Sequence, residues 1–397
     1  MTTCYFLGHE NPYDLDLFQR IKGAVNSIVI KEDSINFIFY RTGVFFSYCL
    51  AAVLEAKQTY PKKTILMTRV TEDNEEDEER KLMLNCYQLP RCVFDKIFHP
   101  LAEKEVDKAT VKYWKRVERT LIRQSKYLIC YHYPKLRDFF SDTFSLVVKQ
   151  PDLQIINLAS EETTYFVQEA VNHLPISEKT VIEKVDQGYT MKNLADEAGV
   201  TVTAIRAKDT RGRMRLRALA SERYQRQQGL QGFVPFTCAA VLPVSSRKMG
   251  SPVISNLRCV MSFLIRSFNV RTSLIEQNDC PSALVGELKW LTIMEGVKLV
   301  VATHFASQAD ADQWSMENGY IPPICTIMNF DPDTRVKRLQ YLKTIAEMMN
   351  RSQFLICAVD EENPMNNGIQ QCIKKHKNTI LFDIQQSTQI EKEGINP

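Results

Sequence analysis

The sequence predicts an α/β protein in which two domains with mostly parallel sheets flank an all-helical segment. Three observations support this fold class. Short apolar runs alternate with helical stretches over residues 1–160 and again over 229–397, whereas residues 161–228 have helical periodicity only. Strands that alternate with helices are typical of parallel sheets with helices on both faces. A chain of 397 residues is also long enough for two or three hydrophobic cores.

The first domain, residues 1–160, is expected to contain five strands with helices between them. Each strand candidate is a short apolar run, and the five cover residues 4–8, 35–40, 64–70, 127–131 and 154–158. Between these runs, residues 48–57 and 106–124 have the apolar spacing of helices.

The last domain, residues 229–397, repeats this alternation after a linker rich in glutamine and glycine at 225–232. Its expected strands are 235–242, 298–302, 324–328, 354–359 and 379–384. Its expected helices are 253–267, 283–295, 309–318, 334–350 and 368–376. The sequence SKYLIC at 125–130 is similar to SQFLIC at 352–357. A duplicated α/β module explains this similarity, although two buried strands of similar composition would also explain it.

The middle domain, residues 161–228, contains the strongest motif, two short helices joined by a tight turn at residues 189–206. Gly199 supplies the left-handed turn conformation, and Ala195 is small where the two helices approach each other. Thr190 and Thr201 stand where helix N-caps are expected. The shared apolar core of the motif is expected to contain Leu194, Ala198, Val200 and Ile205.

This segment, over residues 174–219, resembles the helix-turn-helix of bacterial sigma factors (their region 4) and of related response-regulator domains. The resemblance rests on a first helix led by Pro175, a Gly-x-Thr entry at 188–190 and a basic exit helix. In that family the second helix lies in the DNA major groove. The resemblance therefore implies that DNA bases or phosphates contact Thr201, Thr203, Arg206 and Lys208. It implies DNA-backbone contacts for Arg211, Arg213 and Arg215.

The charge pattern agrees with this expectation. Residues 206–226 carry eight basic side chains against two acidic ones, and neutralisation of phosphates is what such a cluster provides. The alternatives are a helical linker with a solvated basic face and a helix-turn-helix that binds protein.

The first domain resembles the SLOG superfamily, a Rossmann-like group that includes the DNA-processing protein DprA and the LOG phosphoribohydrolases. The similarity is nearest to the small YspA/YpsA-type members. It rests on the opening TCYFLGH at 3–9, on the second strand and turn at 36–43, and on the helix at 48–57 with the residues 60–66 that follow it. The resemblance implies an anion site formed by Gly8, His9, Arg41 and Gly43. The turn keeps one glycine, lacks the family's acid and contains two phenylalanines, so a degenerate scaffold is the alternative.

The last domain resembles the same superfamily more loosely, through residues 350–360 and the loop that follows them. The resemblance implies that Asn366, Asn367 and Gly368 donate N–H groups to an anion or a ribose. An ordinary turn rich in asparagine, glycine and proline is the alternative.

No catalytic machinery is recognisable, so we expect a protein that is not an enzyme. The phosphoribohydrolases need a Pro-Gly-Gly-x-Gly-Thr loop before a catalytic glutamate, and the sequence lacks it. It also lacks a Walker loop, a nucleophile elbow and a metal-binding histidine pattern, so no catalytic or metal-ligating residue is assigned. His304 follows an expected strand, where open α/β sheets bind ligands, but a polar residue there is more often surface.

The bulk composition is that of a globular protein, with 44% hydrophobic and 24% charged residues and a net charge of +3. The 11 cysteines form no CxxC pair, and we expect reduced thiols in a cytoplasmic protein. We expect no signal peptide, and no apolar run is long enough for a membrane span.

Taken together, these features predict a ligand-modulated transcriptional regulator. Two Rossmann-like domains would sense a nucleotide-type ligand, no other cofactor being expected, and a homodimer would bind double-stranded DNA. Three alternatives stay open: a DprA-like protein that binds single-stranded DNA, a degenerate interaction module and a nucleotide-processing hydrolase.

Overall fold

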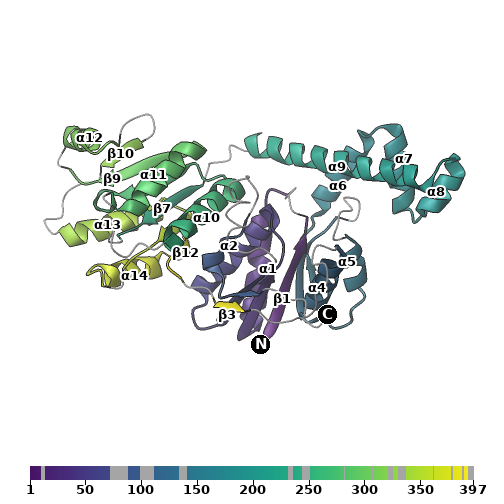
Figure 1. The fold of residues 1–397 in the computed structure, drawn as a ribbon, viewed down its shortest axis with the longest axis horizontal. Helices are drawn as coiled ribbons and strands as arrows, with labels where there is room; N and C mark the ends of the chain where they lie inside the picture. Colours follow the sequence, from purple (N-terminus) through teal and green to yellow (C-terminus); the bar gives the residue numbers. More distant parts are fainter. Residues whose placement is uncertain are drawn as a thin grey trace. The chain divides into compact units, whose positions relative to one another are not determined.

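The computed structural model has the α/β architecture that the sequence predicts, with helices packed around two parallel sheets (Figure 1). It describes residues 1–9, 14–71, 88–98, 111–133, 141–230, 236–243, 251–280, 282–305, 307–320, 325–329, 337–360, 362–376, 379–386 and 389–391. Within these residues, no helix has the length and apolar character needed to cross a membrane.

The strands form one sheet of seven and one of six, and every strand pair with an assigned register is parallel. The first sheet has the order β13 (Gln389–Glu391), β4 (Lys96–Phe98), β3 (Thr64–Val70), β2 (Ser34–Phe39), β1 (Thr2–Gly8), β5 (Tyr127–Tyr131) and β6 (Gln154–Asn157). The second has the order β10 (Cys325–Asn329), β9 (Lys298–Thr303), β8 (Thr272–Glu276), β7 (Thr237–Val241), β11 (Phe354–Cys357) and β12 (Ile380–Asp383).

The two sheets repeat the same strand order around their first strands, β1 and β7. In each sheet the next three strands lie on one side of the first strand and the following two on the other side; the first sheet is extended by β13, which pairs with β4. The similar sequences at 125–130 and 352–357 fall on the equivalent strands β5 and β11 and their approaches. They also make the same contact, since Lys126 N donates to Thr3 O and Gln353 N donates to Thr237 O, both at 3.0 Å. The sequence similarity therefore corresponds to a structural repeat.

The chain divides into two compact units, Met1–Cys49 with Leu101–Phe233 and Gly394–Pro397, and Leu50–Pro100 with Val234–Glu393. The helices up to residue 230 are α1 (Leu17–Lys31), α2 (Val44–Thr59), α4 (Val111–Arg123), α5 (Ser141–Val147), α6 (Glu161–Asn172), α7 (Ile176–Asp186), α8 (Met191–Ala198) and α9 (Val202–Leu230). The predicted domain boundaries near 160 and 228 follow changes in secondary structure and stay predictions. The expected linker at 225–232 is helical as far as Leu230, and residues 231 and 232 lie outside the described part of the chain.

The core of the first unit is centred on β1, which pairs with β2 on one side and β5 on the other. A central parallel strand is buried on both faces, which explains the unbroken apolar run from Cys4 to Leu7. The ring of Phe6 packs against Phe37 and Phe39, with centroids 5.7 and 4.9 Å away.

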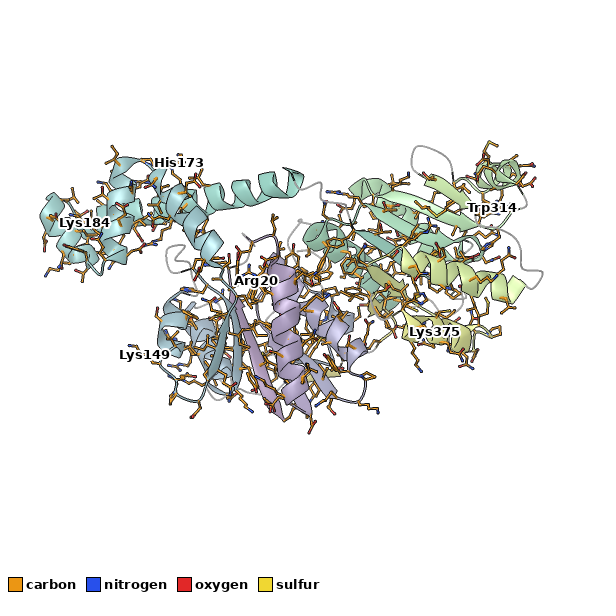
Figure 2. The ribbon with its side chains drawn as sticks, turned by 180° about the vertical axis from the view of Figure 1, so that it is seen from behind. Arg20, Lys149, His173, Lys184, Trp314 and Lys375 are labelled. Atoms are coloured by element: carbon orange, nitrogen blue, oxygen red, sulfur yellow. The ribbon has the colours of Figure 1, made fainter. Side chains whose placement is uncertain are left out.

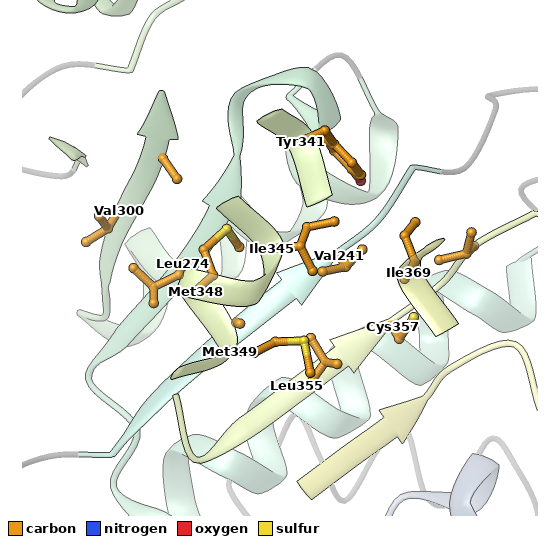
Figure 3. Packing of buried hydrophobic residues seen from close by; sticks show 13 residues of the cluster. Val241, Leu274, Val300, Tyr341, Ile345, Met348, Met349, Leu355, Cys357 and Ile369 are labelled. Atoms are coloured by element: carbon orange, nitrogen blue, oxygen red, sulfur yellow. The ribbon is translucent and has the colours of Figure 1, made fainter. Parts of the chain in front are cut away.

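The second unit has helices on both faces of its sheet. Alternate residues of a strand point to opposite faces. Phe354 contacts Phe268 of α10 (Ser251–Phe268), with ring centroids 4.8 Å apart, whereas the next residue, Leu355, packs with Ile345 and Met349 of α13 (Lys337–Asn350) (Figure 3). The remaining elements are η4 (Gln277–Asp279), α11 (Ala283–Glu295), α12 (Gln308–Glu317), α14 (Asn366–Lys375) and, from the segment 50–100, η1 (Arg91–Val93).

Candidate functional site

The helices α7, α8 and α9 pack around a small apolar core of Val181, Leu194, Ala195 and Ile205. Thr190 caps α8, since its hydroxyl oxygen accepts from Asn193 N at 3.1 Å. Gly199 ends α8 with φ 61°, in the left-handed region that favours glycine. Thr201 Oγ1 then accepts from Ala204 N at 3.2 Å at the start of α9. α8 and α9 are thus two capped helices joined by a tight turn. Of the residues expected in their core, Leu194 and Ile205 are buried, whereas Ala198 and Val200 are exposed, because both lie at the turn.

The first four turns of α9 separate into an exposed and a buried face. Residues three and four apart lie on the same side of a helix. The exposed side contains Thr203, Arg206, Ala207, Thr210, Arg211 and Met214. The buried side contains Ile205, Asp209, Gly212, Arg213 and Leu216. Thr201 is exposed and Lys208 is half-buried, so most of the predicted base-reading positions are accessible.

Glycine at 212 in the middle of α9 is explained by close helix packing. A Cβ atom there would lie 2.8 Å from Ile182 Cδ1 and 3.2 Å from Glu178 Cβ, both on α7. Since these distances are shorter than ordinary contacts, only glycine lets α7 and α9 approach this closely.

All three arginines that were predicted to contact the DNA backbone have partners within this helical group. Arg213 is 3% exposed, and its guanidinium contacts Asp209 at 2.9 Å and Asp186 at 3.2 Å. Arg213 therefore has a structural role as the buried member of an ion pair. Arg215 lies 3.0 Å and Arg211 3.8 Å from the Glu178 carboxylate, but both side chains remain mostly exposed. A second link between helices joins Lys184 of α7, labelled in Figure 2, to Glu197 of α8.

The predicted anion site of the first sheet is filled by the chain's own side chains. A Cβ on Gly8 would lie 2.7 Å from the Phe45 ring, so that ring covers the end of β1. His9 is buried, and its Nε2 accepts from Tyr133 N at 3.0 Å. Gly43 has φ 123°, as the tight entry to α2 requires.

Arg41, the expected cation of that site, is paired with a buried carboxylate and does not face open solvent. Its Nε and Nη2 donate to the two oxygens of Glu118 at 2.7 and 3.0 Å. Tyr5 and Thr143 donate to the same carboxylate at 3.4 and 3.2 Å. Burial opposes the charge of Arg41, but hydrogen bonds to Glu118 and its negative charge raise the pKa of Arg41 overall. Glu118 thus takes the position that an external anion would need.

The predicted site in the last domain lies at the start of α14. Asn366 N donates to Asn363 O at 2.9 Å, and Met365 N donates to the Asn363 side chain at 2.9 Å. Gly368 lies against α13, where a Cβ would meet Leu342 Cδ1 at 2.6 Å. Asn367 is exposed. The N–H of Asn366 therefore has a partner within the turn, and close helix packing explains the glycine at 368.

The structure brings together a buried polar cluster that the sequence did not assign, at the carboxyl ends of β8 and β9. His304 Nε2 lies 2.8 Å from Glu276 Oε1, and Thr344 Oγ1 lies 3.2 Å from the same imidazole. Asp279 accepts from Leu242 N and from the Tyr341 hydroxyl, both at 3.0 Å. We define these five residues as the β8–β9 cluster: Glu276, Asp279, His304, Tyr341 and Thr344.

The cluster alters the ionisation of Asp279. Burial raises the pKa of Asp279 to about 7, against a hydrogen bond from Leu242 N that lowers it; the nearby charge of Glu276 raises it further. Burial and the charge of Asp279 also raise the pKa of Tyr341. In the part of the chain that the structure describes, no group of three His, Cys, Asp or Glu residues could hold a metal ion.

Comparisons with known proteins add no family assignment, since no protein-family model matches the chain and no curated protein does either.

Proposed function

We propose that the chain is a DNA-binding regulator whose α8–α9 helix-turn-helix reads duplex DNA. The carrying observation is the exposed face of α9, on which Thr203, Arg206, Thr210 and Arg211 lie together. The opposite face of α9 is buried against its neighbouring helices. A major groove admits one α-helix, and arginine recognises guanine edges and phosphates. The N-terminal turns of α9 therefore supply the base contacts in this proposal.

The internal ion pairs refine the set of residues that contact DNA. Arg213 is taken up by two aspartates, so it holds α9 against α7. Arg206 is exposed, and Arg211 keeps only a 3.8 Å contact with Glu178. We therefore assign the main phosphate and base contacts to Arg206 and Arg211, with Arg215 in a supporting role.

The test is a mobility-shift titration of duplex DNA at several salt concentrations. An Arg206→Ala/Arg211→Ala variant should bind about tenfold or more weakly than wild type. The slope of log affinity against log salt, which is negative, should also become shallower by about two, because two phosphates are no longer neutralised.

The matched control removes two basic residues elsewhere. Arg123 and Lys149 are exposed on the first unit, and Lys149 is labelled in Figure 2. Arg123→Ala/Lys149→Ala should leave both affinity and salt slope unchanged. If wild type ignores duplex DNA even at low salt, the proposal fails, and single-strand binding or protein interaction becomes the better assignment.

We place the ligand-sensing role in the second unit, because the predicted site of the first sheet is filled internally by Glu118 and Phe45. Glu276 ends the second strand of its sheet, where dinucleotide-binding folds use an acid to hold ribose hydroxyls. Its buried carboxylate accepts from Asn278 and contacts His304, so in this proposal the ribose hydroxyls replace these bonds. In the first sheet the equivalent position is Tyr40, so that sheet has no acid there. The equivalence follows from the register, because Cys4 pairs with Phe37 as Cys238 pairs with Ser273, and both positions lie three residues further on. A nucleotide-type ligand should raise the melting temperature of wild type and not that of Glu276→Gln.

A nucleotide-processing hydrolase is the second candidate, and the elevated pKa of Asp279 favours it. A carboxyl group that is partly protonated near neutral pH can act as a general acid. Chromatography of nucleoside monophosphates incubated with the protein tests this role. Release of free base by wild type but not by Asp279→Asn supports the hydrolase; intact substrate with both proteins removes it.

A further inference from the structure

Helix α11 has an apolar outer face that stays exposed among the described residues of the second unit. Trp290, Ile293 and Met294 are 52%, 44% and 65% exposed. Every exposed residue of this helix is apolar or glycine: Ala283, Gly286, Trp290, Ile293 and Met294. Their spacing of three and four residues puts them on one stripe of the helix, which we call the α11 stripe.

The charges beside the stripe are already paired inside the same unit. Glu287 contacts Arg258 at 2.7 Å, and Glu295 contacts Arg266 at 3.5 Å. Lys289 donates to Gly319 O at 2.5 Å and lies 4.4 Å above the Tyr320 ring. Because all three charged side chains of α11 have partners, the stripe needs a partner surface that is apolar and brings no charge.

The stripe is small at one end and large at the other. Ala283 and Gly286 occupy its N-terminal half, and a Cβ on Gly286 would meet nothing within 4 Å. Trp290, Ile293 and Met294 occupy its C-terminal half. In an antiparallel pair with a two-fold axis at the level of Leu288, residues equally far from 288 face each other. Trp290 of one copy then lies over Gly286 of the other, and Ile293 lies over Ala283.

We propose that the α11 stripe is the homodimer interface, with a second copy of this chain as its partner. The self-complementary order of small and large residues selects a copy of the same helix, and exposed tryptophan is a residue type enriched among interface hot spots. Dimerisation through the second unit does not require the DNA-binding role of α9. The interface would, however, provide the second half-site reader that paired helix-turn-helix proteins use.

The test is the mass of the full-length chain by sedimentation equilibrium without DNA, across the micromolar range. Wild type should reach twice the mass of one chain. Gly286→Leu should raise the dimer dissociation constant about tenfold or more, because leucine fills the space that Trp290 needs. The same change should favour the isolated helix, since leucine is the better helix former. A variant that is well folded yet monomeric therefore separates association from folding.

An exchange of side chains gives the sharpest arm. Gly286→Trp/Trp290→Ala again places a tryptophan opposite a small residue across the axis, so it should dimerise more tightly than either single variant. Leu339→Glu, at an exposed apolar residue of α13, is the control and should leave the mass unchanged. A wild type that sediments as one chain throughout overturns the proposal. A dimer that Gly286→Leu leaves intact also overturns it, because the interface must then lie elsewhere. Neither result bears on DNA binding by α9.

Discussion

Arg213 belongs by sequence to a basic run, yet its buried guanidinium holds two aspartates of the helical group. Removing one partner of a buried ion pair leaves the other charges uncompensated. We expect Arg213→Ala to lower the free energy of unfolding by about 2–4 kcal/mol, measured by urea denaturation. Arg206→Ala, at an exposed position of the same helix, should change it by about 0.5 kcal/mol or less. Equal stability of the two variants would contradict the structural role of Arg213.

Asp279 should make the free energy of unfolding depend on pH. Its pKa is about 7 in the folded protein against an ordinary 3.8, so the folded state binds this proton more tightly than the unfolded chain. The resulting stabilisation is complete below about pH 4 and is lost as the pH rises through 7. The free energy of unfolding should therefore fall over this window, by at most about 4 kcal/mol from this group.

Asp279→Asn isolates that contribution, because the amide stays neutral and its oxygen can still accept from Leu242 N. Every other titratable group is the same in both proteins, so the difference between the two stability curves reports Asp279. Urea denaturation at intervals from pH 4 to 8 should give a flatter curve for the variant. Parallel curves for the two proteins would show that Asp279 is ionised throughout the range.

At the scale of elements, sequence signals succeeded where they are local. Thr190 and Gly199 mark the two ends of α8 within a few residues, and both have the capping roles that the motif predicts. The strand β8 was missed, because a five-residue run that begins Thr-Ser has little apolar pattern of its own. The strands β4 and β13 were missed because each has three residues and exists through pairing such as Lys96 with Gln389.

The β8–β9 cluster was missed for a related reason. His304 was noted as a strand-exit residue, but its partner Glu276 lies 28 positions away, and Tyr341 lies 62 positions from Asp279. Such contacts depend on which strands are neighbours in the sheet. Local periodicity does not determine that order.

The packing of α9 on α7 leads to a prediction for Gly212. Alanine at this position would favour the helix intrinsically, but its Cβ would lie 2.8 Å from Ile182 Cδ1. We expect Gly212→Ala alone to lower the free energy of unfolding by about 1–2 kcal/mol through overpacking.

Ile182→Val removes the Cδ1 atom that causes this conflict. In the Ile182→Val background, Gly212→Ala should therefore cost less, because only the 3.2 Å approach to Glu178 Cβ remains tight, which gives a coupling of about 1 kcal/mol in a double-mutant cycle. Additive effects of the two changes would mean that α7 and α9 do not meet at this point.

At the scale of the whole molecule, the repeat is visible in the cysteines. Cys4 and Cys238 occupy equivalent positions of β1 and β7, and Cys130 and Cys357 occupy equivalent positions of β5 and β11. All four are buried, and burial raises the pKa of each thiol, that of Cys238 to about 12. Each sheet thus has two inert, buried thiols on its central strands, at equivalent positions in the two sheets.

This arrangement predicts one pattern of alkylation for both sheets. Because the thiolate is the reactive species, the four central cysteines should resist iodoacetamide in the native protein at neutral pH. Cys259 and Cys372, which are only half-buried, should be modified first. Mass spectrometry of peptides along a time course distinguishes the sites, and urea should expose all four central thiols to the reagent. Rapid modification of Cys238 or Cys357 in the native protein, with Cys4 and Cys130 protected, would mean that the second sheet opens on its own. Equal protection of all four would mean that the centres of the two sheets, which share the repeated strand order, resist opening to a similar degree.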